Sequence, residues 1–268
     1  MATTPASSNK AKIARRVIEV LDYFDDDHRE ATVMDIVRRY DRPQSSTSEL
    51  LSSLVELGLL HKDPHTRSYS LAPRAALIGS AGQSDIVRDG RLVRLVDRLV
   101  AQTGLSVALF GRICTNAQIV SWRTGARSTA GTRGLYGGLQ APLSETAAGW
   151  LLMSTLPQSR RDGIIRRLNA EASDDRKFPP AEMAARLQAC RDQGYAQGAA
   201  GFGARAEVLA MLLPGQPDDH PLAVGFIYGA DDKVNLGSLL QCLDEATSQL
   251  LSELTVVPAP VERLPNAA

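Results

Sequence analysis

Residues 31–72 form the most informative segment of the sequence, ATVMDIVRRYDRPQSSTSELLSSLVELGLLHKDPHTRSYSLA. Its first part predicts a short helix that ends near Tyr40, because Thr32 can cap the helix and the apolar residues recur at helical spacing. These apolar residues are Val33, Ile36 and Val37. Pro43 then favours a second helix start, since its fixed φ suits a first turn and its missing N–H is not needed there.

The second helix is expected from Pro43 to Leu57, with its apolar residues confined to the C-terminal part. Its first turn and a half, residues 44–48, reads QSSTS. A helix made only for a core would not begin with five consecutive small or amide polar residues. Gln can hydrogen-bond adenine, and hydroxyls can bind bases or phosphates, so the pattern is typical of a recognition helix in a DNA major groove.

A hairpin is expected directly after this helix. Gly58 fits a left-handed helix stop, and residues 59–62 and 68–71 read as two short strands around the turn 63–67, whose tip is basic. Upstream, an amphipathic helix over 13–24 is preceded by cations. These pieces predict a winged helix-turn-helix, although three small helices and a hairpin also occur in protein-protein modules, where a Ser-rich helix start is only a solvated cap.

The overall charge does not decide between these alternatives. The chain carries 30 basic and 30 acidic side chains, so DNA binding would depend on where charges are placed. The side chains expected to contact DNA are Lys12, Arg15, Arg42, Gln44, Ser45, Ser46, Thr47, Ser48, Lys62, Thr66 and Arg67.

These residues resemble the DNA-binding domain of the IclR family of bacterial transcription regulators. The likeness rests on PQSST at 43–47, LGLL at 57–60 and YSL at 69–71, and it continues along nearly the whole chain. Further matching segments are GLSVAL at 104–109, PLS at 142–144, AAG at 147–149, QGYA at 193–196 and LAVGF at 222–226. One departure is Glu49, where the family usually carries a basic residue, so phosphate anchoring there is lost or reversed in sign.

The resemblance implies an N-terminal all-α winged helix-turn-helix and a C-terminal α+β GAF-like effector-binding domain, joined by a helical linker. The expected boundaries are 1–74 for the DNA-binding domain, 75–103 for the linker helix and 104–268 for the effector-binding domain. Within the last, alternating patterns predict a mostly antiparallel sheet flanked by helices. The expected strands are 105–112, 117–122, 205–213 and 221–228, and the expected helices are 145–153, 160–168, 181–193 and 236–254.

An effector site is expected at the helix start 144–148, where free amides and the helix dipole can hold a carboxylate. The resemblance implies backbone contacts from Ala147 and Ala148 and a pocket made bulkier than is usual. The expected effector-binding residues are Leu135, Tyr136, Ser144, Ala147, Ala148, Trp150, Val208, Phe226 and Tyr228. Two alternatives remain open: an aromatic or apolar carboxylate binds there, or the aromatic residues fill the cavity and the regulator works without a ligand.

Neither an enzyme nor a metal or cofactor site is expected. No catalytic His motif appears, the three Cys residues are far apart, and the G-x-G-x-x-A at 201–206 has no helix pattern after it. No apolar run of about 18 residues could span a bilayer, and residues 1–9 lack a signal-peptide core, so a cytoplasmic protein is expected. The expected partners are a double-stranded DNA operator, a small-molecule effector and further copies of the chain, as a homodimer or homotetramer. Whether the protein represses or activates is left open.

Overall fold

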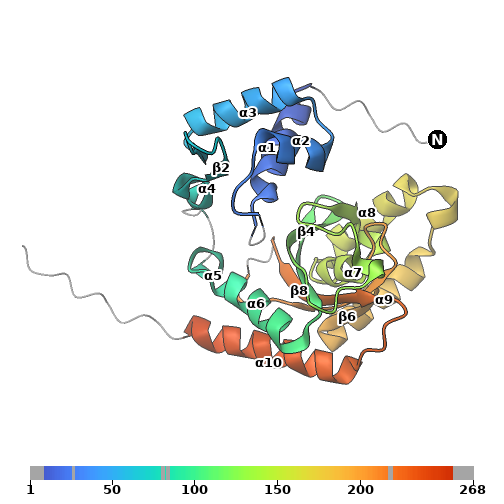
Figure 1. The fold of residues 1–268 in the computed structure, drawn as a ribbon. Coiled ribbons are helices and arrows are strands. Elements are labelled where there is room, and N and C mark those ends of the chain that lie inside the picture. The colour runs from blue at the N-terminus through green and yellow to red at the C-terminus, as the bar shows by residue number, and fades with distance from the viewer. Residues whose placement is uncertain (1–8, 26–27, 80–81, 83–84, 217–219, 256–268) are drawn as a thin grey trace, which may run out of the picture. The chain divides into compact units, whose positions relative to one another are not determined.

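The computed structural model describes residues 9–25, 28–79, 82, 85–216 and 220–255 (Figure 1). The chain divides into two compact units, residues 1–83 and residues 84–268. Each unit has its own hydrophobic core, and each is described by itself.

The first unit has the element order of a winged helix-turn-helix, as predicted. Its elements are α1 (Asn9–Tyr23), α2 (Val33–Tyr40), α3 (Gln44–Glu56), β1 (Leu60–Lys62), β2 (Tyr69–Leu71) and α4 (Pro73–Leu77). The strands pair antiparallel, with Leu60 opposite Leu71. The helices contribute side chains to one core, which also holds the buried Tyr69 of β2. The buried residues of this core are Val20, Ala31, Ile36, Leu51, Leu54, Leu59, Leu60 and Tyr69.

Local capping signals place the ends of α2 and α3. Thr32 and Asp35 form a capping box, in which the Asp35 carboxylate accepts the Thr32 backbone N–H at 2.8 Å. The chain leaves α2 through Asp41, which is left-handed with a φ of 49°. Pro43 was expected inside the first turn of the next helix, but it is the N-cap, with ψ at 136°, and α3 begins at Gln44. Because its carbonyl already accepts the Thr47 N–H, Pro43 still starts the helix from outside it.

The second unit is built on one curled antiparallel sheet of six strands in the order β5-β4-β3-β8-β7-β6. The strands are β3 (Ser106–Ile113), β4 (Asn116–Arg123), β5 (Gln140–Pro142), β6 (Tyr195–Ala199), β7 (Ala206–Leu212) and β8 (Leu222–Gly229). Four of them match the predicted strands, whereas β5 and β6 were not predicted. Both are short edge strands, and β6 contains Gly198, which weakens a strand pattern.

Helices cover both faces of this sheet (Figure 1). On one face lie α7 (Ala147–Ser154), α8 (Gln158–Glu171) and α9 (Pro180–Gln193). On the other lie α5 (Asp85–Arg88), α6 (Arg91–Thr103) and α10 (Leu236–Thr255), with α6 and α10 side by side. The described part of this unit also contains the short 3-10 turns η2 (Ala130–Thr132), η3 (Leu143–Glu145) and η4 (Asp174–Arg176).

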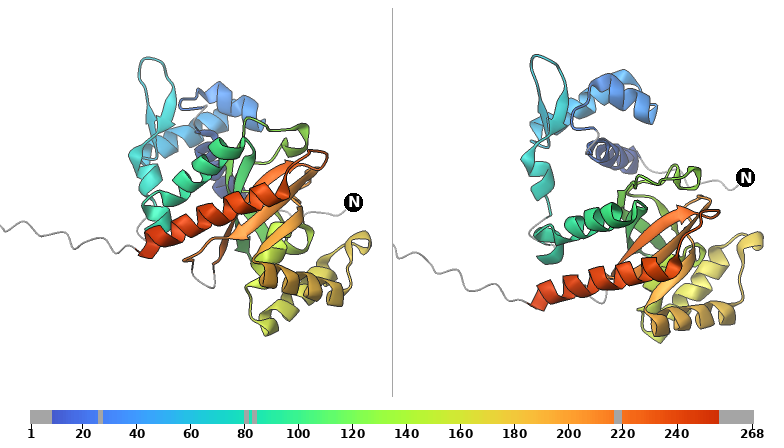
Figure 2. Two further views of the ribbon diagram at one scale, coloured as in Figure 1. Left: turned by 90° about the horizontal axis from the view of Figure 1, so that it is seen from below. Right: turned by 60° about the horizontal axis from the view of Figure 1, so that its bottom comes forward.

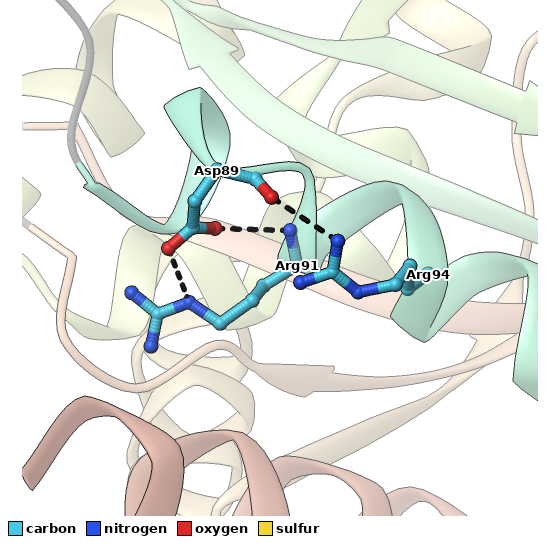
Figure 3. A network of polar contacts seen from close by, with 3 residues as sticks. All are labelled: Asp89, Arg91 and Arg94. Atoms are coloured by element: carbon cyan, nitrogen blue, oxygen red, sulfur yellow. Dashed lines mark hydrogen bonds and ion pairs between the residues drawn. The ribbon is translucent and has the colours of Figure 1, made fainter. Parts of the chain in front are cut away.

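A polar clamp fixes the start of α6 (Figure 3). The Asp89 carboxylate accepts hydrogen bonds from the Arg91 backbone N–H at 3.0 Å and from Arg91 Nε at 2.6 Å, and the Arg94 guanidinium donates to the Asp89 carbonyl at 3.1 Å. Gly90 between them is left-handed, with a φ of 75°. Since Ile86 in α5 is also 1% exposed, the chain is anchored on the second unit from α5 onward.

Candidate functional site

One side of α3 faces away from the core of the first unit and carries only polar residues. Its exposed residues are Gln44, Ser45, Glu49, Ser52, Ser53 and Glu56, and Ser48 is half-buried among them. The opposite side packs into the core through Leu51 and Leu54. The N-terminal part of the polar side therefore presents the amide and hydroxyl groups of Gln44, Ser45 and Ser48 as an accessible surface. We call the set Gln44, Ser45, Ser48, Glu49 and Ser52 the polar stripe.

Thr47 was expected on this surface, and the structure corrects that expectation. Its side chain is 1% exposed, and its hydroxyl donates to the Pro43 carbonyl at 2.9 Å. The reason is helical geometry, because Thr47 precedes Leu51 and Leu54 by four and seven residues and so shares their buried face. Thr47 thus belongs to the core of the unit and cannot contact DNA in this arrangement.

A basic groove of about 580 Å³ lies between α1 and the start of α3. It is lined by Lys12, Ile13, Arg15, Arg16, Arg42, Pro43 and Ser46. The two helices are linked across it by Arg16, whose guanidinium donates to the Ser46 hydroxyl at 3.2 Å. Lys12 and Arg15 are exposed here beside the N-terminal end of α3, so the groove suits an anion such as a phosphate.

Arg42 was also expected to contact a phosphate, but its charge is already paired. Its guanidinium donates to both carboxylate oxygens of Glu19, at 3.0 and 3.1 Å. The side chains keep exposures of 39% and 23%, so the pair is partly shielded from solvent. Arg42 therefore joins α1 to the α2–α3 turn, whereas Lys12 and Arg15 are exposed cations of the groove.

The wing is a turn that extends beyond β1 and β2 (Figure 2). Asp63 organises it by accepting the His65 and Thr66 backbone N–H groups, at 2.7 and 3.1 Å. The hydrogen bond from His65, followed by that from Thr66, holds the pKa of Asp63 below its ordinary value. Thr66 and Arg67 are exposed at the tip, and the Lys62 ammonium lies 5.4 Å from the Tyr69 ring centroid.

In the second unit, the helix at the expected anion site begins two residues later than predicted. Ser144 lies in η3, where its carbonyl accepts a hydrogen bond from Trp150 Nε1 at 2.8 Å. The helix itself begins at Ala147, with Thr146 as N-cap. Thr146 is fully buried, and its hydroxyl has no hydrogen-bond partner among the described residues. The start of α7 therefore combines free helix amides with an unused buried hydroxyl, which the sequence patterns did not single out.

Two of the expected effector residues point to the wrong face of the sheet. Phe226 and Tyr228 pack with α6 and α10, whereas α7 lies on the opposite face. Side chains alternate along a strand, so an assignment off by one residue moves every side chain to the other face. Ala223 and Ile227 are the β8 residues that pack in the cluster on the α7 face. Burial raises the pKa of Tyr228 to about 12, consistent with a phenol that takes part in a core.

The remaining expected residues divide between core and surface. Leu135, Ala147, Ala148 and Val208 are buried in the cluster on the α7 face, and the half-buried Trp150 packs beside them. The Arg186 guanidinium lies 4.3 Å from the Trp150 ring centroid. Tyr136, by contrast, is 53% exposed and is not a wall of that interior.

Two phenylalanines on the α7 face were missed by the sequence patterns. The rings of Phe110 on β3 and Phe202 stack with centroids 6.2 Å apart and an interplanar angle of 18°. Phe202 lies between Gly201 and Gly203 in the loop that joins β6 to β7, and all three have positive φ. As expected, the G-x-G-x-x-A segment is therefore a loop before a strand.

A metal site and a membrane-spanning helix are both missing from the part of the chain that the structure describes. The described residues contain no group of three or more His, Cys, Asp or Glu side chains that could hold a metal ion. Nor does any described helix have the length and apolar character needed to cross a membrane.

Comparison with known proteins identifies the first unit. Residues 14–64 match the IclR helix-turn-helix domain. No curated protein matches the chain. Solved structures that resemble the chain include an IclR transcriptional regulator from Alicyclobacillus acidocaldarius, with 19% identity, a TM-score of 0.59, and coverage of 94% of this chain and 99% of that one.

Two further structures show the same fold. The Thermotoga maritima IclR has 15% identity and a TM-score of 0.59, and 91% of this chain and 98% of that chain are covered. An IclR homolog from Microbacterium hydrocarbonoxydans complexed with 4-hydroxybenzoate has 17% identity and a TM-score of 0.58, with coverage of 90% and 98%. The first unit is thus an IclR helix-turn-helix domain, and the chain as a whole has the fold of IclR-family transcription regulators.

Proposed function

We propose that this protein regulates transcription by binding operator DNA through α3 and the wing, and that it does so as a homodimer or homotetramer. The observation that carries the proposal is the polar stripe of α3 in an IclR helix-turn-helix domain. Gln44, Ser45 and Ser48 supply donors and acceptors for base edges, while the basic groove and the wing supply charge for phosphates. A single recognition helix per chain favours a symmetric assembly on two half-sites.

A gel-shift titration at fixed salt tests this proposal. DNA fragments selected by the wild-type protein are titrated with wild type, with Gln44→Ala and with Arg67→Ala. Gln44→Ala is expected to lower the affinity for the selected DNA roughly tenfold, because a good base contact is lost. Arg67→Ala is expected to lower the affinity less, and by the same factor for every DNA sequence. If both variants bind the selected DNA as tightly as wild type, this docking is wrong.

We further propose that the second unit binds a small carboxylate at the start of α7. The amides of the first helical turn have no partner within the helix, and the dipole of an α-helix favours an anion at this end. The unpartnered Thr146 hydroxyl adds a buried donor beside them. Phe110 and Phe202 add an apolar surface on the same face of the sheet, which suits an aromatic or apolar acid. The 4-hydroxybenzoate complex of the Microbacterium homolog supports this choice of ligand class.

The stacked phenylalanines also favour a second candidate. If Phe110 and Phe202 only fill the interior, the second unit holds no effector and the protein binds DNA without a ligand. A thermal-shift screen separates the two candidates, because a ligand at 100 times its Kd stabilises the native state by about 2.7 kcal/mol. 4-Hydroxybenzoate, benzoate and alkyl acids are compared with 4-hydroxybenzamide, which lacks the charge.

Thr146→Val sharpens this screen, since the substitution keeps the shape of the side chain and removes only the hydroxyl. A buried hydroxyl without a partner is costly, so the variant is expected to be as stable as wild type or more so. The stabilisation by an acid should fall at the same time. If none of the acids changes the melting temperature or the DNA binding of the wild type, the second unit does not sense an acid. The second candidate, in which Phe110 and Phe202 fill the interior, is then favoured.

In a sensing regulator, the effector acts only through its differential affinity for two arrangements of the assembly. We propose that the segment 75–103 carries this difference between the units. Its C-terminal part, α6, packs on the sheet through Leu92, Leu95 and Leu99, and its start is held by the Asp89 clamp. A change at the sheet would therefore move α6 as a unit.

A further inference from the structure

Glu49 lies in the middle of the polar stripe of α3 and is exposed. It follows Gln44 by five residues, which places it about 7.5 Å further along the helix axis. The sequence of α3, QSSTSELLSSLVE, contains no Lys or Arg, and its only other charged residue is Glu56 at the C-terminal end. The surface of α3 that would enter the groove thus carries a negative charge.

The neighbouring hydroxyls do not satisfy this carboxylate. Ser52 donates to the Ser48 carbonyl at 3.0 Å, and Ser53 donates to the Glu49 backbone carbonyl at 3.1 Å. These protons are therefore used by the helix backbone. Among the described residues, the Glu49 side chain has no ion pair and no hydrogen-bond partner. Its oxygens are free to accept hydrogen bonds from a bound molecule.

The cations of the basic groove and the Glu49 carboxylate lie at different positions along α3. Lys12, Arg15 and Arg16 line the groove at the N-terminal end of α3, where phosphates can be held. Glu49, further along the helix, repels phosphates on any sequence. A side chain that lowers affinity for all DNA, and recovers it only where a donor is present, increases the ratio of specific to non-specific binding.

We infer that Glu49 is a specificity-determining residue that accepts a hydrogen bond from the exocyclic amino group of a cytosine in the major groove. An ionised carboxylate only accepts, so it is repelled by guanine O6 and N7 and by thymine O4. Adenine offers an amino group beside the acceptor N7, whereas cytosine offers N4 without one, and this favours cytosine. The inference rests on the proposed function, since it requires α3 to enter the groove.

Selection from a random duplex pool tests the inference, using wild type, Glu49→Ala, Glu49→Gln and the control Glu56→Ala. Glu56 is exposed on the same helix, so its replacement removes the same charge away from the expected bases. Wild type and Glu56→Ala are expected to select the same motif, with one C·G pair per half-site whose replacement by T·A weakens binding about tenfold. Glu49→Ala should lose the preference at that pair and bind non-specific DNA more tightly, and Glu49→Gln should shift the preference to adenine.

Glu49→Ala selecting the wild-type motif with its C·G pair intact would overturn the inference and leave the proposed function standing. A uniform gain in affinity by Glu49→Ala without any change of motif would also overturn it, because Glu49 would then act only through its charge. A wild-type protein that selects no motif and binds no DNA would refute both the inference and the proposed function. Circular dichroism of each variant verifies that substitution at these exposed positions does not alter the fold.

Discussion

The basic groove predicts how salt weakens DNA binding when Lys12 and Arg15 are both replaced by Ala. Both side chains are exposed in the groove, and each is expected to neutralise one phosphate. Each such contact contributes about 0.9 to the slope of log K against log salt, so the slope should fall by about 1.8. Over a fourfold increase in salt this changes the ratio of wild-type to variant affinity by roughly 12-fold.

Fluorescence anisotropy with one labelled duplex, measured at several salt concentrations, gives these slopes directly. Arg42→Ala should change the slope by much less than one contact, since Glu19 already pairs with Arg42 at 3.0 Å. Replacing the exposed Arg160 and Arg166 of the second unit by Ala removes the same charge and serves as the control. A wild-type slope for the Lys12 and Arg15 variant, or an equal fall of the slope in the control, would show that the groove does not bind phosphates.

Three further predictions concern residues whose places the structure decides. Thr47→Val should leave DNA affinity within about twofold of wild type and change stability by only about 1 kcal/mol in urea unfolding, because its hydroxyl serves the helix and not DNA. Thr32→Ala should cost about 1 kcal/mol at neutral pH through loss of the cap. The hydrogen bond from the Thr32 hydroxyl, followed by that from its backbone N–H, lowers the pKa of Asp35 below its ordinary 3.8. The part of the stability that comes from the hydroxyl bond to this carboxylate is present above that value and is lost as pH falls through the folded pKa, so the difference between wild type and variant should narrow in acid. Phe226→Ala should destabilise the protein by about 3–5 kcal/mol without changing which acids bind. Phe202→Ala should change which acids stabilise the protein in the thermal-shift screen. If only Phe226→Ala changed the acid preference, Phe226 and not Phe202 would line the effector pocket.

The helix-turn-helix could be predicted from sequence because its signals are local. Thr32 caps α2 through a residue three positions away, and Gly58 stops α3 with a φ of 71°. These features depend on neighbours in the chain, so their spacing is visible in one sequence. The pairing of Arg42 with Glu19 depends instead on how α1 packs, and no local pattern indicates it.

The faces of β8 could not be assigned for a different reason. The strand reads LAVGFIYG, and it is buried on both sides by helices. An antiparallel strand with one solvent-exposed face shows alternating polar and apolar residues, but a strand that is covered on both faces has a continuously apolar sequence. Nothing in such a run distinguishes Phe226 from Ile227, and the expected pocket therefore took residues from the wrong face. Thr47 was misplaced similarly, because a buried Thr within QSSTS looks like its exposed neighbours.

We propose that α3 reads a specific DNA sequence as part of a symmetric assembly. This claim can be tested by sequencing the genomic fragments that are captured by the purified wild-type protein and by a variant with Gln44 and Ser48 replaced by Ala. We predict that wild type enriches a few sites sharing a two-fold-symmetric motif, with half-sites about one helical turn or a multiple of it apart, and that the variant loses this enrichment. Capture of fragments without any common motif by the wild type, or equal enrichment by the variant, would contradict the claim.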